Sequence, residues 1–118
     1  MTKENKINWI LRIAIFGEFL GHGVFAIQGK AAWIEWTQQL LGVDVALATQ
    51  IIFVIGVMDI ILAILVLVKP MRGFLLWMAF WGLWTAILRP IVGEPIWDFV
   101  ERWANWGAPL ALYYLRSK

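Results

Sequence analysis

The stretch "IIFVIGVMDIILAILVLV" at residues 51–68 is apolar throughout, apart from Gly56 and Asp59. An α-helix needs about 20 mostly apolar residues to cross the hydrocarbon core of a bilayer. The whole chain of 118 residues is 62% hydrophobic and only 15% charged. A soluble domain of this size has too little interior to hide so much apolar surface. The composition therefore predicts a membrane protein whose partner is the lipid bilayer.

Three more apolar segments flank this one along the chain. Strict apolar–polar alternation, the mark of a membrane β-barrel, is absent from them. We therefore predict an all-α, polytopic membrane protein with a single transmembrane domain over residues 1–118. Its fold is expected to be an up-down-up-down four-transmembrane-helix bundle. The predicted spans are residues about 8–28, 48–68, 73–90 and 96–115.

The connections between these segments differ in length. "KPMRG" (69–73) and "RPIVGEP" (89–95) are short turns, which make consecutive spans antiparallel neighbours. The first connection is longer and contains "AAWIEWTQQLLG" (31–42), with Trp33 and Trp36 at helical spacing. This pattern predicts a short interfacial helix in the first outer loop.

Positive side chains set the expected orientation, because cytoplasmic loops carry an excess of lysine and arginine. The residues that follow this rule are Lys3, Lys6, Lys69, Arg72, Arg116 and Lys118. We therefore expect both termini in the cytoplasm. The net charge of +2 is not gathered in a basic patch, which argues against a nucleic-acid partner. The chain has no cysteine, which excludes disulfide and thiolate chemistry.

Several ionisable residues fall inside the apolar segments, where a charge costs about 2.5–3.5 kcal/mol even on the lenient insertion scale. Glu18 and the only histidine, His22, are four residues apart and share a helix face. Asp59 is expected at a similar depth on the second span. We predict Glu18, His22 and Asp59 as the catalytic, proton-exchanging set.

Further polar residues lie in the outer half of the third and fourth spans, whereas the inner half is almost wholly apolar. This one-sided distribution predicts a polar cavity that opens toward the outer face and is closed toward the cytoplasm. Glycines at 17, 21, 56 and 82 are expected to let helices approach or to leave room for a ligand. The predicted ligand-binding residues are Arg89, Glu101, Arg102, Asn105, Trp81 and Thr85.

Other interpretations stay open. Intramembrane charges also serve as structural ion pairs. The stripe of Trp77, Trp81 and Trp84 suits stacking on a flat ring, but such stripes more often pack another helix. A bis-histidine haem needs a second histidine, and the acidic residues match no metal-site spacing. We therefore expect no metal, and haem is disfavoured.

The first span, "LRIAIFGEFLGHGVFAIQGK" (11–30), resembles the DoxX-like family of small bacterial four-helix membrane proteins. The second, "IGVMDIILAILVLVKP" (55–70), is similar to that family's acid-bearing second helix. The matching positions are Arg12, Gly17, His22, Gly23, Lys30 and Asp59. The resemblance implies a bacterial inner-membrane location and a link to quinone-dependent oxidation, at most as a membrane component of an oxidoreductase.

The sequence is compatible with three functions. The first is a redox-linked membrane subunit that binds a quinone or another small ligand in the outer-half pocket. The second is a noncatalytic accessory or assembly subunit of a larger membrane complex. The third is a small-solute or lipid transporter, which the one-sided cavity favours least. In each case we expect a homo-oligomer or other membrane subunits as partners.

Overall fold

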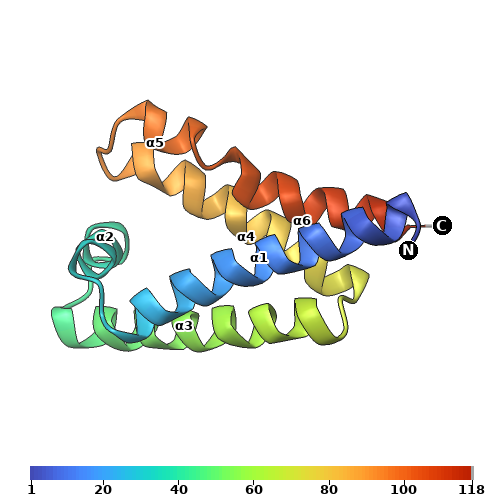
Figure 1. Cartoon of the computed structure of the whole chain (residues 1–118). Coiled ribbons are helices and arrows are strands. Elements are labelled where there is room, and N and C mark those ends of the chain that lie inside the picture. Colours follow the sequence, from blue (N-terminus) through green and yellow to red (C-terminus); the bar gives the residue numbers. More distant parts are fainter. Residues whose placement is uncertain (118) are drawn as a thin grey trace.

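The computed structural model describes residues 1–117, and these residues form helices and turns with no strand (Figure 1). The helices are α1 (Lys3–Ile27), α2 (Ala31–Leu41), α3 (Val45–Val68), α4 (Arg72–Ile91), α5 (Ile96–Val100) and α6 (Trp103–Leu115). The all-α prediction is confirmed.

Three helices are long and apolar enough to cross a membrane: α1, α3 and α4, with 25, 24 and 20 residues. They match the first three predicted segments. Their outward faces are apolar as well. On α3, for example, Val54, Ile61 and Ile64 are 65%, 52% and 51% exposed. Side chains of this kind are suited to contact with lipid rather than water.

The fourth predicted segment, 96–115, differs from the expected continuous helix. It is divided at Glu101 and Arg102 into the 5-residue α5 and the 13-residue α6. At 1.5 Å per residue, α6 alone extends about 20 Å, against about 30 Å of hydrocarbon core. Pro109 lies inside α6, so the interruption comes earlier in the chain than this proline.

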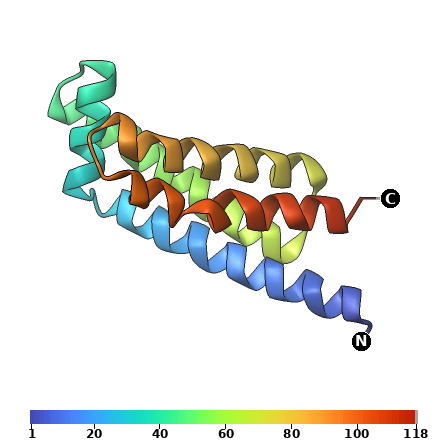
Figure 2. The ribbon, with the colours of Figure 1, turned by 90° about the horizontal axis from the view of Figure 1, so that it is seen from above.

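Two closely packed helix pairs make up most of the structure. In the first pair, α1 packs on α3 where a β-carbon on Gly56 would stand 2.8 Å from the main-chain oxygen of Gly23. In the second pair, α4 packs on α6 at Gly82. Figure 2 shows α6 between α1 and α4, and contacts join it to both. Gly56 and Gly82 therefore allow close approach, as predicted, whereas open space surrounds Gly17 and Gly21.

The end of the molecule that holds both termini is filled by apolar side chains. The buried cluster there includes Ile15, Val66, Leu75 and Leu112, from four different helices. Arg12 is the charged exception. Its Nε donates to the carbonyl of Val66 at 3.0 Å and its Nη2 to that of Leu67, so that it caps the C-terminal end of α3.

The two long helices α3 and α4 diverge from the turn that joins them (Figure 1). They are antiparallel, as predicted, but they pack on each other only weakly. At the end remote from the termini, α2 lies across the long helices and contacts α3 (Figure 1). Gly29 and Gly42 flank α2 with φ values of +74° and +66°, a backbone region in which glycine avoids steric strain. This arrangement leaves space between α3 and α4, below α2.

Candidate functional site

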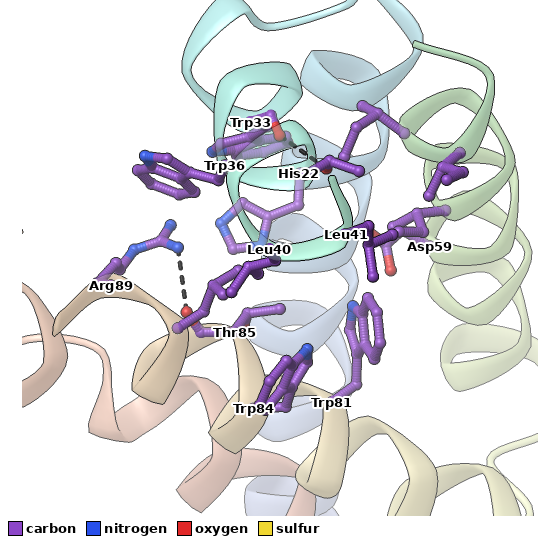
Figure 3. Close-up of a pocket in the computed structure, with 15 residues that line it drawn as sticks. His22, Trp33, Trp36, Leu40, Leu41, Asp59, Trp81, Trp84, Thr85 and Arg89 are labelled. Atoms are coloured by element: carbon purple, nitrogen blue, oxygen red, sulfur yellow. Dashed lines mark hydrogen bonds between the residues drawn. The ribbon is translucent and has the colours of Figure 1, made fainter. Parts of the chain in front are cut away.

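A cavity of about 210 Å³ lies between α3 and α4 at the end remote from the termini (Figure 3). α1 contributes one lining residue, His22. α2 contributes Trp33, Trp36, Thr37, Leu40 and Leu41. α3 contributes Ile51, Ile52, Ile55 and Asp59, and α4 contributes Trp81, Trp84, Thr85, Leu88 and Arg89. The cavity is thus built from four helices that are distant in sequence.

Four indoles line the cavity from two sides. Trp33 and Trp36 come from α2, whereas Trp81 and Trp84 come from α4 and lie across the cavity from them (Figure 3). Indole rings offer large apolar faces on which a flat ring can stack. The predicted stripe on α4 is divided: Trp81 and Trp84 line the cavity, while Trp77 stacks on Trp81 with ring centroids 5.7 Å apart and is not a lining residue.

His22 approaches the cavity from α1. Its ring meets Trp33 edge to face, with centroids 5.7 Å apart. The side chain is half-buried, and no protein hydrogen bond engages its ring nitrogens within residues 1–117. A neutral imidazole offers one donor and one acceptor, so His22 can exchange a proton with a bound molecule.

Asp59 lies on α3 and is only 4% exposed. Its Oδ1 is fully buried and has no hydrogen-bond partner among the described residues. A buried polar atom of this kind is uncommon, because leaving it unpaired costs free energy. Asp59 is therefore a deeply buried lining residue with a polar atom that the protein itself leaves unpaired.

Arg89 is 5% exposed and lies near the C-terminal end of α4. Its Nη1 donates to the carbonyl of Thr85 at 3.1 Å, and its guanidinium carbon stands 4.9 Å from the centre of a Trp36 ring. The Thr85 hydroxyl donates to the carbonyl of Gly82 at 3.1 Å. One hydrogen bond uses one of the five guanidinium donors, which leaves others for an acceptor in the cavity.

Five of the predicted site residues line this cavity: His22, Asp59, Trp81, Thr85 and Arg89. Four do not. Glu18 is half-buried on α1, one turn before His22, and is not a lining residue. The others are Glu101, Arg102 and Asn105, which lie where α5 meets α6.

Glu101 and Arg102 interact with each other instead of with the cavity. The Arg102 Nη1 lies 2.5 Å from the Glu101 Oε1 and also donates to the carbonyl of Asp98 at 3.2 Å. This is the only ion pair within residues 1–117. Asn105 packs against α4 through its backbone. A β-carbon on Gly82 would stand 2.2 Å from the main-chain carbonyl oxygen of Asn105. Pro109, four residues later, has no N–H to donate to that carbonyl.

Five of the lining residues that the sequence did not predict belong to α2. Trp33, Trp36, Thr37, Leu40 and Leu41 share one face of α2, and this spacing was visible in the sequence. The sequence pattern predicts only an interfacial role for that face. Its position over the cavity depends on how α2 folds back between Gly29 and Gly42, which the spacing does not specify.

The acidic residues and His22 do not form a metal centre in the described part of the chain, where no three potential ligands gather closely enough to hold an ion. Comparisons with protein-family models, with curated proteins and with solved structures each find no match for this chain.

Proposed function

We propose that this chain is an integral membrane protein that binds a small, flat, mostly apolar molecule with a polar edge, such as a quinone. The observation that carries the proposal is the cavity itself, with four indoles as walls and Arg89 beside them. The indoles suit the faces of a ring, and the unused guanidinium donors of Arg89 suit a carbonyl oxygen at its edge. The resemblance of the first two spans to the DoxX-like family points to the same class of ligand.

Proton exchange with the bound ring would fall to His22 and Asp59, the two titratable lining residues besides Arg89. General acid–base groups must lie within hydrogen-bond reach of the atom they serve. Electron transfer to or from the ring needs a carrier, which a partner subunit would supply. We therefore propose a binding component of a membrane oxidoreductase system rather than a complete enzyme.

We further propose that α1, α3, α4 and the combined α5–α6 segment cross a bacterial inner membrane as a four-helix, up-down-up-down bundle. In this arrangement α2 lies at the outer interface and both termini are cytoplasmic. The Asn8 Oδ1 accepts from the Arg116 Nη1 at 3.2 Å, and Arg72 donates to the Tyr113 hydroxyl at 2.9 Å. The termini and the α3–α4 turn thus share one end, which carries most of the positive residues that favour a cytoplasmic location.

Binding of 1,4-naphthoquinone to the purified protein in lipid nanodiscs tests the proposal, with empty nanodiscs as the reference for lipid partition. Equilibrium dialysis should show retention by the protein above that of lipid. Arg89→Gln and Trp84→Leu should each lower the affinity about tenfold or more, in line with the loss of a charge-assisted hydrogen bond or an aromatic contact.

Two positions outside the cavity offer matched controls. Arg72→Gln on α4 and Trp97→Leu on α5 change the same residue types at exposed positions that do not line the cavity, so their affinity should equal that of the wild type. If the protein retains no more naphthoquinone than empty nanodiscs, or if all four variants bind equally, the ligand-binding function is wrong. An accessory-subunit role then becomes the better explanation.

A further inference from the structure

We infer that the cavity selects a ring that carries a hydroxyl group over the same ring with a carbonyl or ether oxygen in that place. For a quinone-like ligand, the preferred form is the reduced, hydroxylated one. The inference rests on the proposed function, because it concerns the chemistry of the ligand in the same cavity. Its basis is the unpaired carboxyl group of Asp59.

The protein leaves Asp59 without a compensating partner. The side chain is 4% exposed, and its buried Oδ1 accepts no hydrogen bond within the described residues. Because the one ion pair in residues 1–117 joins Arg102 to Glu101, no protein cation neutralises Asp59. Burying a carboxylate is costly unless it is paired or hydrogen-bonded. A bound molecule that donates a hydrogen bond to this carboxyl group removes part of that cost.

The second buried charged group has the opposite requirement. Arg89 and Asp59 lie on opposite sides of the cavity, and the indoles of Trp81 and Trp84 lie to one side of both (Figure 3). A guanidinium only donates, and a carboxyl oxygen that carries no proton only accepts, so the unpaired Oδ1 of Asp59 requires a donor to satisfy it. The ligand that satisfies both offers an acceptor toward Arg89 and a donor toward Asp59.

Oxidised and reduced rings differ in how well they meet these two requirements. A quinone has a carbonyl oxygen at each end, so it accepts from Arg89 but has nothing to donate to Asp59. A hydroquinone has a hydroxyl at each end, and a hydroxyl both accepts and donates. One of its oxygens accepts from Arg89 while the other hydroxyl donates to Asp59. The geometry of the two charged residues therefore favours the reduced ring.

Two probes that undergo no redox change under these conditions isolate this effect: 6-methoxy-2-naphthol and 2,6-dimethoxynaphthalene. In each probe one methoxy oxygen can accept from Arg89, but only the hydroxyl of the naphthol can donate to Asp59 from the other end of the ring. Equilibrium dialysis against wild-type protein in nanodiscs, with empty nanodiscs subtracted, should show about tenfold tighter binding of the naphthol, the size expected for one hydrogen bond. In Asp59→Leu the two probes should bind equally.

Asp59→Asn keeps one oxygen acceptor but adds an amide NH2 group that can donate to the oxygen of either probe, so the preference should fall to about threefold. If circular dichroism shows that Asp59→Leu does not fold, the ratio of the two probe affinities in Asp59→Asn tests the inference by itself. Asp44→Asn, at the N-cap of α3 and outside the cavity, serves as the matched control and should keep the wild-type preference.

Equal binding of the two probes to the wild type, tighter binding of the dimethoxy probe, or an unchanged preference in Asp59→Asn would overturn the inference while leaving the proposed function in place. Failure of both probes and of naphthoquinone to bind above the lipid reference would overturn the proposed function itself.

Discussion

The main-chain oxygen of Asn105 lies 2.2 Å from the point that a β-carbon on Gly82 would occupy. No other residue has a side chain small enough for this contact, so the backbones of α4 and α6 meet directly. Close packing of this kind is how helices associate in a membrane, where apolar burial between helices offers little driving force. The contact also fixes α4, which carries Trp81, Trp84 and Arg89 into the cavity.

Gly82→Ala should therefore destabilise the protein by about 1–3 kcal/mol, because the added methyl group meets backbone rather than a movable side chain. Thermal unfolding followed by circular dichroism in detergent measures this. Gly73→Ala, on the same helix but with open space around it, should change the unfolding temperature little. Equal effects of the two substitutions would show that α4 and α6 do not pack at Gly82.

Gly56→Ala should weaken both folding and ligand binding. The added β-carbon would stand 2.8 Å from the Gly23 carbonyl oxygen and would push α1 away from α3. Since His22 and Asp59 come from these two helices, the cavity changes shape as well. Dialysis with naphthoquinone should show reduced affinity, whereas Gly21→Ala, which meets nothing within 4 Å, should bind as the wild type does.

Arg12 should contribute to stability without affecting the ligand. Its guanidinium donates to the carbonyls of Val66 and Leu67 and stands 3.9 Å from the centre of a Trp9 ring. Arg12→Met should lower the free energy of unfolding by about 2–3 kcal/mol through the loss of charge-assisted hydrogen bonds. Arg12→Lys should recover only part of this, because an ammonium lacks the planar fork that reaches two carbonyls. Naphthoquinone affinity of the folded variants should stay unchanged.

The proposed orientation can be tested with single cysteines, because the chain has none of its own. In intact cells, a membrane-impermeant maleimide should label Glu35→Cys on α2 but neither Asn5→Cys nor Ser117→Cys. The latter two should react after the membrane is opened. Labelling of Asn5→Cys and Glu35→Cys from the same side would contradict an arrangement in which α1 crosses the membrane once.

The long helices were predictable from sequence because their signal is local. A run such as residues 51–68 has few stable alternatives to a helix in lipid. The interruption of the fourth segment was not predictable in this way. Adjacent residues on a continuous helix do not face each other, so the sequence does not predict a pairing of Glu101 with Arg102. The break between α5 and α6 lets the side chains of Glu101 and Arg102 form an ion pair, and neither side chain lines the cavity.

The cavity was predictable in part. The spacing of Glu18, His22 and Asp59 identified the polar half of the molecule, since depth follows from position along a span. Whether two of these side chains reach the same cavity depends on how each helix is rotated and packed. The spacing of residues along the chain does not determine this. This is why His22 and Asp59 line the cavity while Glu18 does not. The position of Trp33 and Trp36 above it depends on a chain reversal, which is a tertiary property.

No residue of α2 is buried, and Gly29 and Gly42 separate α2 from the long helices. Substitutions in α2 can therefore reshape one wall of the cavity at little cost to the packing of α1, α3, α4 and α6. Related proteins could thus acquire different ligands by changing eleven exposed or half-exposed positions, with the membrane-crossing scaffold retained.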